Sequence, residues 1–359
     1  MIKTYHYRIY PTFKQAKILL VWLKALRNLH KQGLSWRKEV YNKTGGSVNW
    51  VTQANALPKL RQASSTFGMM HNDVLQDTLR RLDKAYQVFF RRVQAGEASG
   101  FPRFKSVSRY RSMTFSHLSK KLIRNIRKRT GRIIVPKVGH VAIRYHRLLP
   151  DEKIKHLTIQ RKASGWYTNI AVEIPDVLEV EVKTTIGIDV GIESFLTTSD
   201  GDKAHNPQYF RESEKKLTKA QRILFRREKG STRYKEQCEH VAKIHEHIAN
   251  QRRDFHSKTA HRLFAQCEEV AVEDLKIGNM VKNPHLVKSI SDAAWGNFQL
   301  ILQSKAANAG KQLTKVDPKY TSQSSDKHPR NPRFWDRSAK LYKIRWTDAS
   351  NKHRLFRAG

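Results

Sequence analysis

The spacing of hydrophobic residues at the start of the chain changes from a strand period to a helical period. KTYHYRIY (3–10) alternates as a short strand does, Pro11 and Thr12 suit a helix start, and FKQAKILLVWLKALRNLHKQ then forms an amphipathic helix for which Gly33 fits the stop. SWRKEVYN gives a second helix. Residues 1–50 are therefore predicted to resemble a helix-turn-helix, a pattern that any helical hairpin also gives.

Helical spacing returns between residues 71 and 95, inside a helical lobe predicted for residues 51–111. The large apolar residues of this stretch repeat every three or four positions, which is typical of one buried helix face. They are Leu75, Leu79, Leu82, Tyr86 and Phe89.

GFPRFKS (100–106) breaks the helical pattern, because Pro102 excludes a continuing helix. Phe101 and Phe104 alternate there with Arg103 and Lys105. Aromatic rings between cations suit stacking on bases together with contacts to phosphates. A strand with one buried face gives the same alternation, so both interpretations stand.

Strand patterns dominate from about residue 112 to 175, in GRIIVPKVGHVAIRYH, KHLTIQRKA and GWYTNIAVEIP, with a turn at Ala163-Ser164-Gly165. We expect a small β-barrel or sheet, a β-barrel-like region spanning residues 112–180. Its basic run RNIRKR adds four candidate nucleic-acid contacts: Arg124, Arg127, Lys128 and Arg129.

TTIGIDVGIESFLTTSDG (184–201) places one aspartate in a β-branched, apolar run. Ile186, Ile188 and Val190 would fill one face of a strand while Asp189 points to the other, and residues 194–199 would form the return strand. A carboxylate in the middle of such a strand costs several kcal/mol of desolvation unless it is compensated. We therefore expect a cation near Asp189.

EEVAVEDLKIGNM repeats this arrangement, with Val270 and Val272 facing a core and Glu273 emerging as the strand ends. An aspartate and a glutamate on neighbouring strands would form a divalent-metal site with hard oxygen ligands. Two Mg²⁺ ions about 4 Å apart can activate water and stabilise the leaving oxygen in phosphodiester cleavage. The alternative is an aspartate paired with one of the many arginines. Asp274 and Glu193 point away and are expected to be structural.

RREKGSTRYKEQ (226–237) is a polar break before a helix at about 238–266 that has charges on most faces. Its thin apolar stripe consists of Ile244, Ile248, Phe255 and Leu263, so we expect it on the surface or against phosphates. The five histidines between His240 and His261 are interpreted as surface or RNA-facing residues. Cys238 and Cys267 are isolated, so no zinc site can be built from thiolates.

Composition narrows the class of partner. The 359 residues suffice for about two domains, and 69 Lys plus Arg against 31 Asp plus Glu give a formal charge of +38. Self-repulsion of this size would destabilise a compact fold unless a polyanion neutralises it, which indicates nucleic acid. The longest apolar run, ILLVWL, is far shorter than the ~20 residues of a membrane helix. We expect a cytoplasmic monomer with reduced thiols and no membrane contact.

The two carboxylate segments also carry a family resemblance. GIDVGIESFLTTSDG resembles the first RuvC motif, and VAVEDLKIGNM the second, of TnpB-type proteins of insertion sequences, which are relatives of type V CRISPR effectors. The similarity extends over roughly residues 1–323. It implies a transposon-encoded, RNA-guided DNA endonuclease with an RNase H-like (RuvC) domain, in which Asp189 and Glu273 match the first two acidic Mg²⁺ ligands. Guide RNA and the guide–target duplex would then be held by the N-terminal half.

The resemblance stops after TSQ. The family continues there with paired cysteines of a zinc ribbon and a third catalytic aspartate, whereas this chain has no cysteine after Cys267 and offers only Asp336 and Asp348 as late candidates. We expect no zinc. Residues 324–359 are expected to be a divergent, poorly ordered basic tail that reads like a shifted frame or a decayed end, with a genuine RNA-binding tail as the alternative.

The expected fold is α+β and multidomain, with helical and β-barrel lobes before a RuvC-like domain at 181–323. Two functions remain open at this point. One is a Mg²⁺-dependent, RNA-guided DNA endonuclease that some late aspartate completes. The other is a nuclease-deficient, RNA-guided DNA-binding protein, because a two-metal site lacking one carboxylate would cut slowly while the basic surfaces still bind. A transposase that joins DNA strands itself finds no supporting motif.

Overall fold

The structure is a computed structural model that describes residues 1–116, 118, 123–127 and 129–317. The chain divides into two compact units, Met1–Asp176 and Val177–Gly359. Each unit combines helices with one sheet and has its own hydrophobic core. In the described part of the chain, no helix is both long and apolar enough to cross a bilayer.

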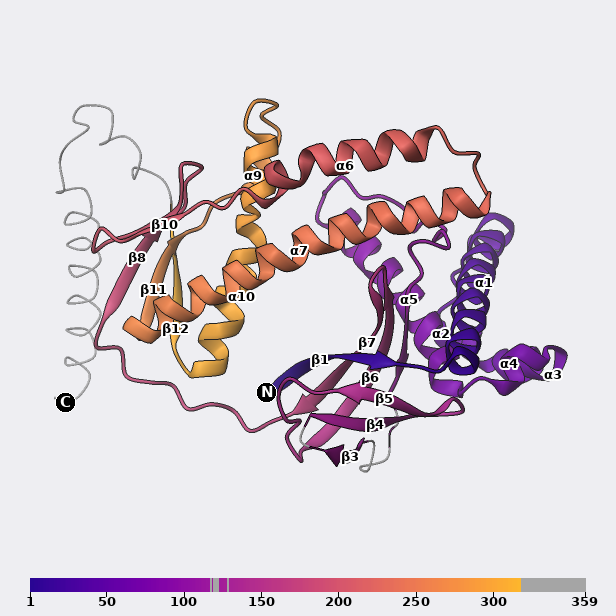
Figure 1. Cartoon of the computed structure of the whole chain (residues 1–359). Coiled ribbons are helices and arrows are strands. Elements are labelled where there is room, and N and C mark those ends of the chain that lie inside the picture. Colours follow the sequence, from indigo (N-terminus) through magenta and orange to yellow (C-terminus); the bar gives the residue numbers. More distant parts are fainter. Residues whose placement is uncertain (117, 119–122, 128, 318–359) are drawn as a thin grey trace, which may run out of the picture. The chain divides into compact units, whose positions relative to one another are not determined.

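The first unit contains a seven-stranded sheet in which every pair of neighbouring strands is antiparallel (Figure 1). The spatial order is β2-β6-β7-β1-β5-β4-β3. The strands are β1 (Ile2–Tyr10), β2 (Ser112–Phe115), β3 (Ile123–Arg127), β4 (Thr130–Val135), β5 (Gly139–Arg144), β6 (Lys153–Lys162) and β7 (Gly165–Glu173). Of the two forms expected for residues 112–175, the pairings give a sheet with β2 and β3 as its end strands, and β1 is inserted between β5 and β7.

The helices of the first unit are α1 (Phe13–Thr44), α2 (Trp50–Asn55), α3 (Leu57–Ala63), α4 (Ser65–Met69) and α5 (Asn72–Gln94). Thr12 caps α1 in a capping box with Gln15, which confirms the predicted start. The predicted stop at Gly33 is wrong, because α1 continues to Thr44 as one helix. Gly33 instead allows close packing on α5: a Cβ there would lie 3.1 Å from Leu82 Cδ2.

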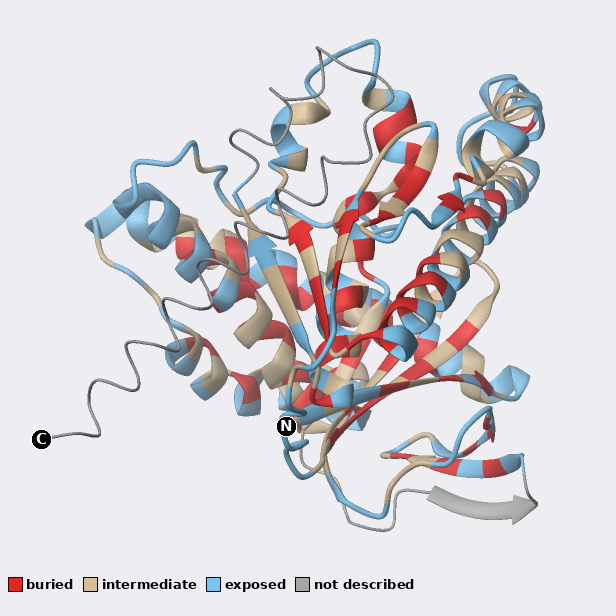
Figure 2. Cartoon of the chain, turned by 90° about the vertical axis from the view of Figure 1, so that its left-hand side faces the viewer, coloured by how far each residue is buried: buried red, intermediate tan, exposed pale blue. Residues whose placement is uncertain are grey.

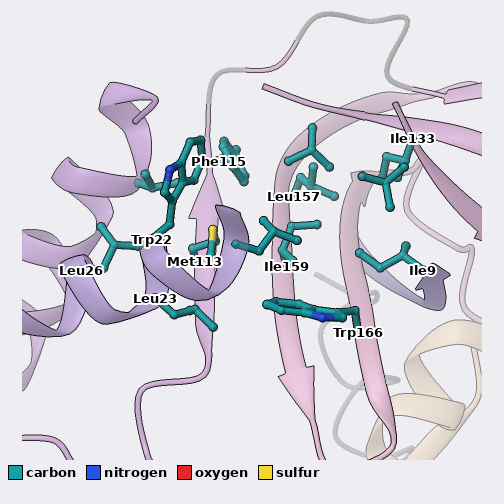
Figure 3. Packing of buried hydrophobic residues seen from close by; sticks show 14 of the residues in the cluster. Ile9, Trp22, Leu23, Leu26, Met113, Phe115, Ile133, Leu157, Ile159 and Trp166 are labelled. Atoms are coloured by element: carbon teal, nitrogen blue, oxygen red, sulfur yellow. The ribbon is translucent and has the colours of Figure 1, made fainter. Parts of the chain in front are cut away.

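The core of the first unit lies between α1 and the sheet (Figure 3). Trp22, Leu23 and Leu26 of α1 belong to the same buried cluster as the inward side chains of β2, β6 and β7. Buried and exposed residues alternate along the strands, as expected for a sheet with one covered face (Figure 2). The labelled residues on the sheet side are Ile9, Met113, Phe115, Ile133, Leu157, Ile159 and Trp166.

The second unit contains a five-stranded sheet of order β10-β9-β8-β11-β12, in which β8, β11 and β12 are parallel to one another and β9 pairs antiparallel with both β8 and β10. The strands are β8 (Thr185–Asp189), β9 (Ser194–Thr198), β10 (Lys203–His205), β11 (Glu269–Glu273) and β12 (Gln312–Val316). The helices are α6 (Tyr209–Phe225), α7 (Thr232–Gln266), α8 (Ile277–Met280), α9 (Val287–Ala293) and α10 (Trp295–Ala309).

Helix α7 differs from its prediction in two respects. It begins at Thr232, capped by Ser231, rather than near residue 238. One of its five histidines is not a surface residue: His256 is 2% exposed and lies against Phe195 and Phe298. Its Nε2 is 3.0 Å from the Ala293 carbonyl oxygen. The prediction of a surface position was wrong because the sequence does not show which residues cover this face of the helix.

Candidate active site

Strand β8 presents Asp189 at its carboxyl end. Ile186 and Ile188 are buried as predicted, while Asp189 is the last residue of the strand and is exposed. Gly191 follows in a tight turn, where a Cβ would lie only 3.0 Å from the Ser194 carbonyl oxygen. The structure therefore places this carboxylate at the carboxyl end of a central strand, so the expected position in the middle of the strand is wrong.

Strand β11 brings Glu273 beside Asp189. The two strands run parallel, with Val270 opposite Ile186 and Val272 opposite Ile188. Asp189 and Glu273 each follow the last of these pairs, so both lie at the carboxyl ends of neighbouring strands. The sequence predicted that neighbouring strands would join these two acids, and the register of the sheet does so across 84 positions of the chain.

Among the described residues, no basic side chain forms an ion pair with the carboxylate of Asp189. The protein around the carboxyl group of Asp189 raises its pKa by desolvation, the Glu273 carboxylate raises the pKa further, and the Val190 backbone N–H lowers it. The cation expected near Asp189 is therefore not found among the described residues. The pair therefore favours binding of a proton or a metal cation.

Two adjacent carboxylates fit a divalent metal by their donor chemistry, since hard cations such as Mg²⁺ prefer oxygen ligands. Within the described ranges, no group of three or more His, Cys, Asp or Glu residues is placed to hold a metal ion. The two late candidates for a third acid, Asp336 and Asp348, lie outside the described residues. The described part of the site thus offers a cation the two carboxylates of Asp189 and Glu273.

Residues next to the pair have separate structural partners. Asp274 forms an ion pair with Lys315 of β12 at 2.8 Å, in agreement with a structural role. The Gln299 side chain of α10 donates to the Glu273 carbonyl at 3.4 Å, which fixes the end of β11 against that helix. Glu193 is exposed in the turn between β8 and β9.

The candidate nucleic-acid segment GFPRFKS forms neither helix nor strand, so the alternative of a strand with one buried face is wrong. Phe101 is 42% and Phe104 48% exposed, as binding of bases would require. Lys38 of α1 lies over both rings, at 5.1 and 5.3 Å from their centroids. Arg103 and Lys105 are exposed beside them.

Two contributors to this segment were missed. Lys31 and Lys38 are seven residues apart on α1, and Lys31 lies 5.9 Å from the Phe104 ring centroid. Their helical spacing was visible in the sequence, but nothing local linked α1 to residue 104. Partial burial, and then the Arg81 guanidinium, lower the pKa of Lys105, which marks this as a crowded cationic region.

The second candidate group follows β3 and the turn after it. Arg124 and Arg127 lie on β3, where Arg124 is paired in register with Arg132 of β4. Arg129 is exposed in the turn. Lys128 lies outside the described residues.

Models of three protein families match the chain. A model described as "Helix-turn-helix domain" matches residues 1–46, although α1 is continuous there. The OrfB_IS605 model, described as "Probable transposase", matches residues 169–284 and so contains both carboxylates. A model described as "Cas12f1-like, TNB domain" matches residues 295–347.

Curated relatives cover most of the chain. A Streptomyces pristinaespiralis protein named "Putative RNA-guided DNA endonuclease" is 31% identical over 88% of this chain and 77% of its own length. An Escherichia coli K12 protein, "Putative RNA-guided DNA endonuclease InsQ", is 26% identical over 90% and 82%. A solved Cas12f1–sgRNA–target DNA complex shares the fold, with a TM-score of 0.56 at 13% identity, over 89% of this chain and 77% of that one.

Proposed function

The chain belongs to the family of RNA-guided DNA endonucleases related to the OrfB_IS605 transposases, and from this premise we propose that it cleaves DNA selected by a bound guide RNA. The observation that carries the proposal is the pairing of Asp189 and Glu273 at the ends of two parallel strands. The family match to residues 169–284 contains both residues. They are the catalytic carboxylates in this proposal.

The strand order of the second unit supports an RNase H-like (RuvC) domain. The central strand β8 carries the first acid. The antiparallel β9, followed by β10, lies on one side of it, and the parallel β11 with the second acid lies on the other. Carboxyl ends of parallel strands meet at one sheet edge, where loops and helix starts leave room for a ligand. The sugar–phosphate backbone of a nucleic acid would reach the carboxylates at the carboxyl ends of these strands.

Asp189 and Glu273 would hold Mg²⁺. When bound, this ion supplies charge stabilisation at the phosphate during phosphodiester cleavage. Glu273 raises the pKa of Asp189 as a neighbouring negative charge, so a bound cation would be favoured by both carboxylates at once. Ion pairing keeps Asp274 on Lys315 and out of this role.

The third acid in this proposal is Asp336 or Asp348. The Cas12f1-like family match spans residues 295–347 and therefore includes Asp336 but ends before Asp348. Separate Asp336→Asn and Asp348→Asn variants decide between them. Only the variant that removes the metal-binding aspartate should lose cleavage activity. If neither variant loses activity, the site operates with two protein carboxylates.

The proposed partners are guide RNA and target DNA. A formal charge of +38 supplies the electrostatic attraction. The proposed contacts in the first unit are the exposed aromatic and basic residues of 101–105 and the basic residues of 124–129. The alternative of a guided binder without cleavage is not favoured, because both curated relatives are named as endonucleases.

Co-expression with the flanking locus tests the proposal. Bound RNA is recovered and sequenced, and DNA matching its guide is incubated with the purified complex with and without Mg²⁺. Asp189→Ala and Glu273→Ala should each lower cleavage on the order of 100-fold or more, since each removes a proposed ligand of the ion that would stabilise charge at the phosphate. Asp274→Ala, one position further along, is the matched control and should retain activity. Cleavage that survives both variants would refute the assignment.

A further inference from the structure

The outward face of the first unit's sheet carries basic and aromatic residues of β1. Tyr5, Tyr7 and Ile9 of β1 point into the core. His6, Arg8 and Tyr10 therefore lie on the opposite face, because side chains alternate along a strand. β1 lies between β5 and β7, and Arg8 is paired with a residue of each, Arg144 and Tyr167. His6 is paired with Asn169 of β7, and Tyr10 with Ala142 of β5.

Arginines face one another across this sheet. Arg8 is directly opposite Arg144 of β5, and Arg132 of β4 is opposite Ala142 in the next position of the same face. Like charges in direct cross-strand positions destabilise a pair of strands. The outward positions of β1, β4 and β5 include no acidic residue to neutralise them. This arrangement is complementary to an anion with repeating charge.

Aromatic rings lie beside these arginines. His6 and Tyr167 of β7 are stacked, with centroids 5.0 Å apart and planes 8° from parallel. The Arg8 guanidinium is 5.3 Å from the Tyr10 ring centroid and 6.0 Å from that of Tyr167. Lys162 of β6 lies over Tyr167 at 4.7 Å, and Tyr10 is 45% exposed.

Hydrogen bonds hold the rings in place. Lys162 Nζ is 3.3 Å from His6 Nε2, and because an ammonium only donates, that nitrogen accepts. The other ring nitrogen, Nδ1, then carries the hydrogen and donates to Asn169 Oδ1 at 2.6 Å. Ser164 Oγ bonds the Tyr167 hydroxyl at 2.8 Å, and Arg8 donates to the Ser164 carbonyl at 2.9 Å. A fixed array loses little conformational entropy on binding.

We infer that the patch formed by Arg8, Tyr10, Arg144, Lys162 and Tyr167 binds an unpaired segment of RNA, with bases against the rings and phosphates at the arginines. Tyr10 is exposed and Tyr167 partly exposed, and accessible rings among cations suit unstacked bases, whereas a duplex offers chiefly its backbone. The inference rests on the proposed function, in which RNA is a bound partner, and assigns to it a single-strand site separate from residues 101–105.

Fluorescence anisotropy on the full-length chain tests the inference. The probes are labelled oligouridine of about 20 nucleotides, longer than one typical single-strand site, an oligothymidine of equal length, and an RNA duplex. Tyr167→Leu should weaken oligouridine binding about 5- to 100-fold by removing one stacking surface. Tyr167→Phe keeps the ring and should restore binding. Tyr41→Leu, at an exposed tyrosine of α1, is the matched control and should change little.

A second variant separates charge from stacking. Arg8→Gln combined with Arg144→Gln should weaken binding and lower the slope of log affinity against log salt by about 1.4, since each single-strand phosphate contact contributes about 0.7. Lys229→Gln with Arg233→Gln removes the same charge from exposed positions of the second unit and should leave the slope nearly unchanged.

Five outcomes bear on the inference. Selective loss of oligouridine binding in the Tyr167 and arginine variants supports it. Equal loss of duplex binding overturns the single-strand assignment, and equal loss of oligothymidine binding overturns the preference for RNA. Unchanged oligouridine binding refutes the patch while leaving the proposed function intact, whereas an unmodified chain that binds no RNA contradicts the proposed function itself.

Discussion

Arg37 of α1 and Asp83 of α5 form an ion pair at 3.0 Å whose side chains are only 5% and 12% exposed. Gln53 of α2 accepts from Arg37 Nε at 3.0 Å, and Gln87 donates to the second Asp83 oxygen at 2.8 Å. The pair thus joins three helices of the first unit, and both Asp83 oxygens are bonded. Gln53 also donates to the carbonyl of Gly33, at the point of close helix packing.

Removal of Asp83 should destabilise the first unit. Asp83→Ala leaves the buried Arg37 charge without its partner, so the free energy of unfolding should fall by about 3 kcal/mol. Urea unfolding followed by circular dichroism measures the change. Asp254→Ala breaks the exposed pair with Lys258 on α7 and should have no measurable effect. Equal decreases in the free energy of unfolding of the two variants would contradict the larger contribution expected of the buried ion pair.

Asp189→Asn should abolish cleavage without weakening the fold or RNA binding. The folded-state pKa of Asp189 is raised, so the ionised form is less favoured in the folded than in the unfolded chain, and stability from this group is lost as pH rises through that pKa. The neutral amide of the introduced asparagine carries no charge to desolvate, so the variant avoids this loss of stability. Its melting temperature near neutral pH should equal or exceed that of the unmodified chain. Glu193→Gln in the following turn is the control. A large loss of RNA affinity would show that Asp189 serves binding as well.

Acid should destabilise the chain through its buried histidines. Burial lowers the pKa of His256 to about 4 from the usual 6.5, and that of His30 likewise to about 4. Between these pH values the unfolded state binds more protons, so stability falls as pH decreases, by up to roughly 3 kcal/mol for each histidine. His256→Gln keeps a donor for the Ala293 carbonyl and should flatten the profile of unfolding free energy against pH. The exposed His245→Gln should not.

Binding to nucleic acid should depend steeply on salt. With a formal charge of +38, many phosphate contacts release counterions, and log affinity should decrease linearly with log salt with a slope of several units. Electrophoretic mobility shifts between low and physiological salt measure this slope with the RNA that copurifies. A flat response would refute the electrostatic argument for the whole chain.

Local patterns in the sequence were sufficient for the elements that carry the site. Alternating apolar residues identified the strands ending in Asp189 and Glu273, because one buried face imposes a period of two. Thr12 marked the start of α1 through its capping chemistry. The family motifs indicated a nuclease function, since these motifs occur in the family's order along most of the chain.

Only the tertiary structure decided which distant residues meet. Gly33 reads as a helix end in isolation, yet packing against Leu82 explains it inside α1. His256 reads as a surface residue, yet Phe195 and Phe298 cover it. Arg8 and Arg144 become neighbours because β1 pairs with β5 across 136 positions. Periodicity reports which face of an element is apolar, whereas the partner of that face is set by long-range packing, so the sequence determined the elements and the fold determined their contacts.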